Sequence, residues 1–178
     1  MMSADPLFDT VQIGRWAEHV GIAPLMAMRW SWPVAEVLHF VGICLLFGTV
    51  GVLDLRLLGL GRGLSMQRLL ALVPWGAAGF ALCVATGLCF VLSMPGQYLY
   101  NPAFQIKLAF MAAAGCNTVA FYLISAKTIR SSAADALAPS HARAIAFVSL
   151  FCWLAVITCG RVITAFRPPQ HWCAWCSP

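Results

Sequence analysis

The sequence predicts an all-α integral membrane protein: a four-helix bundle preceded by an N-terminal amphipathic helix at the membrane interface. Hydrophobic residues make up 61% of its 178 residues and charged residues only 10%, whereas about 25% of a soluble globular domain is charged. Four segments are also long and apolar enough to cross a bilayer, which takes about 20 helical residues. These predicted spans cover residues 34–60, 69–94, 103–125 and 142–166.

The first 33 residues are less apolar, and they form the predicted interfacial segment. Apolar residues recur there at helical spacing beside charged ones, which is typical of a helix lying on the bilayer surface. A soluble cap that binds a partner protein is the alternative. The apolar residues are Phe8, Val11, Trp16 and Val20, and the charged or titratable ones are Asp9, Arg15, Glu18 and His19.

The links between the spans carry glycine, proline and small polar residues, as exposed turns do. They read GLGRGLSMQ, PGQYLYNP and KTIRSSAADALAPSH. Short links join antiparallel helices, so residues 34–167 are predicted to be one transmembrane domain. A tail rich in Trp and Cys follows at 168–178.

The net charge of +5 is dispersed and includes no run of Lys or Arg, which excludes a nucleic-acid-binding surface. Six of the eleven Lys and Arg residues fall near the links after spans one and three. Because positive charge favours the cytoplasmic side, this bias predicts a bacterial inner-membrane protein with both termini in the periplasm.

The first span contains the ionisable residues that point to a site. Glu36 and His39 are three residues apart, so they project from nearly the same helix face, and that face continues to Asp54. Ionisable side chains within a membrane usually face the bundle interior. We therefore expect an inward polar edge with charge at both ends, with Asp54 paired to a cation on another helix and Arg56 at the interface.

The up-and-down topology places further polar residues in the same layer as His39. A b-type haem pocket uses side chains such as an imidazole and a thioether as iron ligands and cations beside the propionates. This layer contains one imidazole, one thioether and two cations. His39 would be an axial ligand, Met94 a second one, and Lys107 and Arg161 the partners of the propionates. Gly42 and Gly48 would leave room for the macrocycle. The whole predicted layer is Glu36, His39, Met94, Lys107 and Arg161.

The same residues also have a purely structural interpretation. Glu36 and His39 are near a helix start and Lys107 can extend toward the interface, so they could form an ion-paired structural cluster. Metal or proton handling is a further alternative. Polar residues in the middle of spans are predicted to make helix–helix hydrogen bonds; they are Thr86, Ser93, Asn117 and Thr118.

The tail HWCAWCSP contains Cys173 and Cys176 in a Cys-x-x-Cys pattern. It lacks the following His that covalent haem attachment uses, which disfavours a c-type haem. The two thiols could form a redox disulfide or, with His171, bind a soft metal. The tail tryptophans also suit a plain interfacial anchor. The other six cysteines are expected to be small apolar residues.

Several motifs resemble those of a widespread family of four-span bacterial membrane proteins, over residues 32–167. They are LDLRLLGL (Leu53–Leu60), NPAFQIKL (Asn101–Leu108) and GRVITAF (Gly160–Phe166). The chain is more distantly similar to the HemJ family of membrane protoporphyrinogen oxidases, which bind b haem, and to CopD-type membrane domains.

His39, Arg56 and Lys107 match the His, Arg and Lys that mark HemJ-like proteins. The stretch RLLGLGRG lacks the second His of that family, and the acidic, Asn-containing motif before the last helix is also missing. The resemblance therefore implies haem binding more than protoporphyrinogen oxidation.

Together the residues predict a membrane b-type haem-binding protein that works in electron transfer with a redox partner, as a component of a membrane oxidoreductase. The first alternative is a cofactor-free accessory subunit of a larger membrane complex, and the second is copper or proton handling. No Ser/His/Asp arrangement, phosphate loop or zinc motif is present in the sequence.

Overall fold

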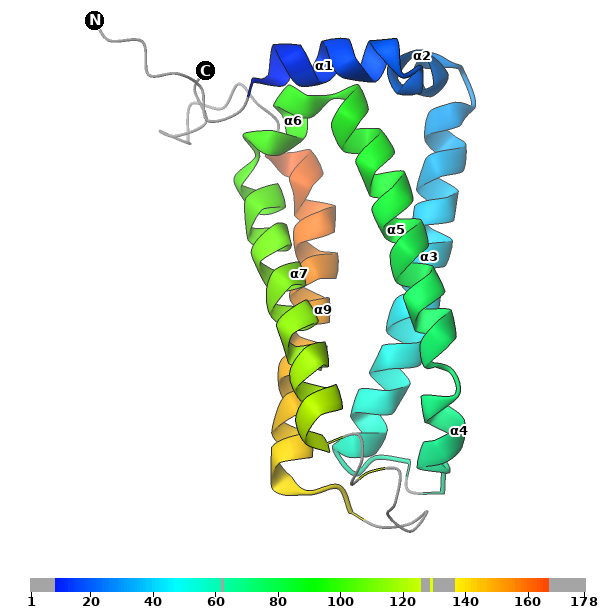
Figure 1. Ribbon diagram of the computed structural model, residues 1–178, viewed down its shortest axis with the longest axis vertical. Coiled ribbons are helices and arrows are strands. Elements are labelled where there is room, and N and C mark those ends of the chain that lie inside the picture. Colours follow the sequence, from blue (N-terminus) through cyan, green and yellow to red (C-terminus); the bar gives the residue numbers. More distant parts are fainter. Residues whose placement is uncertain (1–8, 62, 126–128, 130–136, 167–178) are drawn as a thin grey trace, which may run out of the picture.

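The computed structural model describes residues 9–61, 63–125, 129 and 137–166. Within this part, four helices are long and apolar enough to cross a membrane: Ser31–Leu57, Met66–Ser93, Pro102–Ser125 and Ser140–Ala165. They stand side by side as an all-α bundle (Figure 1). The predicted fold class is confirmed, and the chain is a multi-pass membrane protein.

Shorter elements subdivide and flank these spans. The first span is α3 (Ser31–Leu57), and α1 (Thr10–His19) and α2 (Ile22–Ala27) precede it. The second span is α4 (Met66–Leu70) with α5 (Val73–Ser93), and α6 (Pro95–Leu99) leads to the third. The third is α7 (Pro102–Ala120) with the π-helical turn η1 (Phe121–Ser125), and the fourth is α9 (Ser140–Val162) with the 3-10 turn η2 (Ile163–Ala165).

The long helices pack in the order α5–α3–α9–α7. Helix α3 packs along α5, α7 packs along α9, and α3 and α9 join the two pairs. Helices α5 and α7 are neighbours in the chain but do not pack closely in the described part. Helices α1, α2 and α6 lie at one end of the bundle, here called the α1 end, and α4 lies at the opposite α4 end (Figure 1).

The predicted N-terminal amphipathic helix exists as α1. Asp9 caps it, since its carboxylate accepts a hydrogen bond of 2.8 Å from the backbone N–H of Gln12. Ala17 is buried against the bundle while Trp16 is 54% exposed. The helix lies across the ends of the spans (Figure 1) and contacts α5 and α6, so it covers the α1 end.

The first span ends three residues earlier than predicted. Gly59 adopts a left-handed φ of 99°, a conformation that glycine allows and that commonly ends helices. Its N–H bonds to the carbonyl of Arg56 at 3.1 Å, and that of Leu60 bonds to Leu55 at 3.0 Å. The second span is interrupted just before Pro74, whose missing N–H breaks the backbone pattern.

Glycines bring α3 and α5 into close contact. A Cβ atom on Gly42 would lie 2.8 Å from the carbonyl oxygen of Gly79 and 2.7 Å from Sγ of Cys83. Small residues allow such close packing in membranes. The expectation that Gly42 makes room for a macrocycle is therefore wrong, because α5 occupies that space, whereas Gly48 faces open space.

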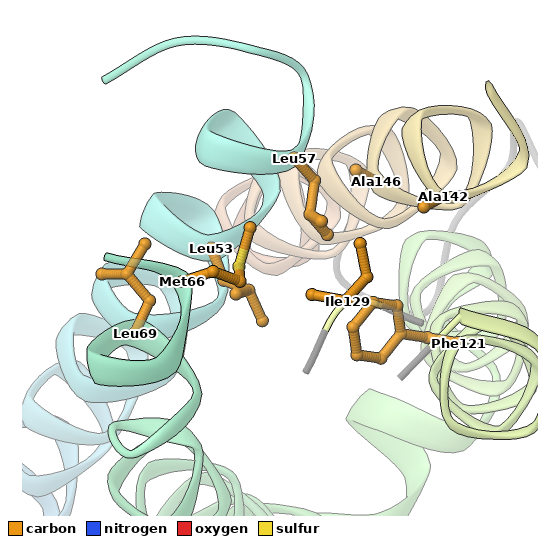
Figure 2. Packing of buried hydrophobic residues seen from close by; sticks show 8 residues of the cluster. All are labelled: Leu53, Leu57, Met66, Leu69, Phe121, Ile129, Ala142 and Ala146. Carbon is orange, nitrogen blue, oxygen red and sulfur yellow. The ribbon is translucent and has the colours of Figure 1, made fainter. Parts of the chain in front are cut away.

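Apolar side chains close the α4 end. Figure 2 shows Leu53 and Leu57 of α3 meeting residues of α4, α9 and the end of the third span. A second cluster joins α3, α7 and α9 in the middle of the bundle. The first cluster is Leu53, Leu57, Met66, Leu69, Phe121, Ile129, Ala142 and Ala146; the second is Leu46, Ala114, Cys152, Trp153 and Val156.

Candidate functional site at His39

His39 lies in the half of α3 nearer the α1 end and faces α5. Its Nδ1 is 2.7 Å from Oγ1 of Thr86. The Thr86 hydroxyl also lies 2.8 Å from the carbonyl oxygen of Leu82 and donates its single proton there. When the hydroxyl proton is on that carbonyl, Oγ1 accepts a hydrogen bond from Nδ1–H of His39, and Nε2 of this Nδ1–H tautomer carries the lone pair.

One face of α5 forms the surroundings of this imidazole. Phe90 approaches it edge-on, with ring centroids 5.9 Å apart. The Cys83 thiol donates to the backbone carbonyl of His39 at 3.5 Å. A Cβ atom on Gly87 would lie 3.8 Å from Cε1 of the imidazole, so glycine leaves the space beside that ring edge free of a side chain.

Lys107 is the cation of this layer. It is half-buried in α7, and its Nζ would lie 3.6 Å from a Cβ atom on Gly160 of α9. The ammonium is near enough to act electrostatically on His39 and Cys83. Among the residues that the structure describes, no carboxylate pairs with it. A cation in this position suits an anionic group from a bound molecule.

Three predicted members of the layer have exposed side chains. Glu36 is exposed and accepts a 3.1 Å hydrogen bond from Nε1 of Trp32, whose ring packs on Phe90 of α5. Met94 is 47% exposed and lies eight residues beyond Thr86, about 12 Å along a helix. Arg161 is exposed on α9. The structure brings together His39 and Lys107 alone from the predicted layer.

Arg56 is buried in the last turn of α3. It is 2% exposed, and its Nε donates to the carbonyl oxygen of Leu64 at 3.0 Å. It follows His39 by 17 residues, about 25 Å along a helix. Arg56 therefore fastens the turn after α3 and stands apart from the imidazole.

Asp54 is also buried, at 5% exposure. Among the described residues the expected cation partner on another helix is not found, and the side chain that bonds Asp54 is the hydroxyl of Ser149 on α9. Its second oxygen, Oδ2, has no hydrogen-bond partner. The inward polar edge is thus confirmed at this end of α3.

The predicted helix–helix hydrogen bonds form in part. Asn117 donates from Nδ2 to the carbonyl oxygen of Ile145 on α9 at 3.0 Å, and Thr86 bonds His39 across α3 and α5. Ser93 and Thr118 instead donate to carbonyls one turn back in their own helices. Two of the four polar residues therefore join neighbouring helices.

Sequence reasoning missed the role of Asn101. This residue is fully buried; its side-chain oxygen caps α7 by accepting from the N–H of Ala103 at 3.0 Å. Its Nδ2 donates to the carbonyl oxygens of Ile163, at 3.0 Å, and of Phe166. The Asn-Pro pair at a helix start was the available signal, since it marks a cap.

No metal cluster is present in the described ranges, since no three His, Cys, Asp or Glu side chains gather there. The proposed ligands of the tail, His171, Cys173 and Cys176, lie outside the described residues. Copper handling by that tail stays a prediction.

No protein-family model, curated protein or solved structure matches the chain.

Proposed function

We propose that the protein binds one b-type haem through Nε2 of His39 and exchanges electrons with a redox partner at the membrane. The observation that carries this proposal is the hydrogen bond from His39 to Thr86. Histidines that bind metals commonly donate their other ring N–H to a neighbouring acceptor, which sets the tautomer and the ring direction. His39 has this arrangement within a membrane-spanning helix.

The surrounding residues fit such a group in part. Nε2 would supply a lone pair to the iron, Lys107 would offer a cation to a carboxylate of the haem, and Gly87 leaves the space beside Cε1 free. Met94 is too far along α5 to be a second ligand beside His39. The haem would supply one-electron chemistry; His39 would hold its iron, Thr86 would orient the imidazole, and Lys107 would neutralise a carboxylate.

The proposal includes a location. We infer a bacterial inner membrane with both termini on the periplasmic side, from the distribution of Lys and Arg. In this orientation His39 and Lys107 lie in the outer half of the membrane. The redox partner would then dock at the α1 end.

A visible absorption spectrum tests the haem directly. We expect detergent-purified protein to show reduced-minus-oxidised b-type bands, and His39→Ala to lose them because the axial nitrogen is gone. His19→Ala is the matched control, since His19 is exposed on α1, and it should keep full haem content. Added imidazole should restore bands to His39→Gly. A flat spectrum from haem-replete cells would overturn the proposal.

A second candidate function is an accessory subunit of a larger membrane complex. Helix α7 exposes a run of small residues, Ala112, Ala113, Gly115 and Cys116, and nothing lies within 4 Å of a Cβ atom placed on Gly115. Such surfaces allow close helix packing in a membrane. This function predicts a colourless protein that co-purifies with other membrane subunits in mild detergent and loses them in Gly115→Leu.

A further inference from the structure

Asp54 is a buried acid that the proposed haem site does not use. It lies one turn before the end of α3, fifteen residues from His39, which is about 22 Å along a helix. Its side chain is turned into the α3–α9 contact, where Ser149 bonds one of its oxygens. The other oxygen is buried and has no partner.

An ionised carboxylate is poorly accommodated in these surroundings. A buried charge needs a paired cation or several donors to offset its lost hydration. Asp54 has one hydroxyl donor and an orphan oxygen. A neutral carboxyl group avoids this cost, since it needs no counter-ion and can exchange hydrogen bonds with a serine hydroxyl.

In the part of the chain that the structure describes, the charged groups on the surrounding elements do not supply a cation to Asp54. Within the described residues, Ser149 is the one side chain that acts on Asp54. Arg56 on the same helix is engaged with Leu64. Other titratable residues of the packed elements are Arg68 on α4, Cys83 and Cys89 on α5, and His141, Arg143, Cys152 and Arg161 on α9.

We propose that Asp54 is a proton-binding site, at which the carboxyl group of the folded protein holds a proton beside Ser149 and exchanges it with water. The carboxylate takes a proton from water and returns it to water, and no other bond changes. Acids buried inside membrane bundles commonly mark proton pathways. This site does not depend on haem.

Infrared spectroscopy of the purified protein in lipid nanodiscs tests the site. We expect wild type minus Asp54→Asn to show the carbonyl stretch of one protonated carboxyl group, shifted in Asp54→Glu and lowered in frequency in heavy water. Asp9→Asn is the matched control, because Asp9 is an exposed helix cap, and it should remove a carboxylate signal only. Ser149→Ala should shift the carbonyl band by removing its hydrogen-bond partner.

Three results would overturn the proposal. Loss of a carboxylate signal alone in Asp54→Asn would show that Asp54 is ionised. A band that does not respond to heavy water would show a proton that never exchanges. If Asp54→Asn does not fold, an unshifted carbonyl region in Ser149→Ala would contradict the site. None of these measurements requires haem, so their outcome is independent of the absorption spectrum that tests the His39 site.

Discussion

At the scale of single residues, a threonine decides which nitrogen of His39 is free. Thr86 is 7% exposed, and its hydroxyl donates a hydrogen bond to the carbonyl oxygen of Leu82 in its own helix. With its proton on that carbonyl, it acts toward His39 as an acceptor, and the ring proton is then on Nδ1. Nothing in the sequence near His39 reveals this, because the two residues are 47 positions apart.

Replacing Thr86 with Val should weaken haem binding without emptying the site. The variant keeps the side-chain shape but leaves Nδ1–H without its acceptor; such a loss near a metal typically costs 10–100-fold in affinity. Haem retention during detergent washing measures this. Thr158→Val is the control, since Thr158 is exposed and bonds only its own helix. Equal retention in both variants would contradict the role of Thr86.

The absence of a side chain at Gly87 should keep the space beside the His39 imidazole open. A Cβ atom there meets Cε1 at ordinary contact distance, so Gly87→Ala should fold normally and gain up to about 1 kcal/mol of helix stability. Gly87→Leu should cover Nε2 and lower haem content at least several-fold, measured by absorbance per protein. Gly115→Leu, on an open surface, should keep its haem; a haem-replete Gly87→Leu would refute this role.

At the scale of elements, the close contact of α3 with α5 positions His39 over Thr86. The contact runs through Gly42 and Gly79, where backbone approaches backbone. The two helices carry their polar groups on this shared surface, so their separation determines the hydrogen-bond length. The glycines of α3 and α5 are visible in the sequence, but the sequence does not show that these two helices pack against each other there.

Gly79→Ala should push these helices apart. Its Cβ atom would lie 2.7 Å from both the carbonyl oxygen of Gly42 and the backbone nitrogen of Leu46, and backbone atoms cannot move aside cheaply. Overpacking of this kind costs about 1–3 kcal/mol, which unfolding in mixed detergent would measure. Gly115→Ala should be near neutral. A neutral Gly79→Ala would show that α3 and α5 separate freely.

At the scale of the whole molecule, the two polar sites lie in opposite halves of the bundle. His39 and Lys107 belong to the α1 end, and Asp54 with Ser149 belongs to the α4 end. Apolar clusters occupy the middle and the α4 end. The proposed haem site therefore belongs to the α1 end and the proposed proton site to the α4 end.

The orientation of the whole bundle is testable with reporter fusions. We expect alkaline phosphatase fused after residue 178 to be active in a bacterial host, because the proposed topology puts the α1 end, where α9 ends, in the periplasm. The same enzyme fused after Leu60 should be inactive, since that turn belongs to the α4 end. The reverse activities would invert the inferred topology and move the His39 site to the cytoplasmic half.

The sequence by itself determined the membrane class and the four spans. Apolar runs of spanning length leave the backbone no stable alternative to helices in lipid, and glycine and proline marked most helix ends. It also placed His39 and Lys107 in one predicted layer with Glu36, Met94 and Arg161, because ionisable residues inside a span are costly and few.

Only the tertiary structure decided which of these residues meet. Helical spacing assigns a residue to a face, but the face that turns inward depends on how neighbouring helices pack. Glu36 and His39 share a face by spacing, yet the first is exposed while the second reaches Thr86. Among the described residues, Asp54 meets Ser149 of α9 and no cation. These pairings depend on how distant parts of the chain pack together, and no local sequence pattern predicts that packing.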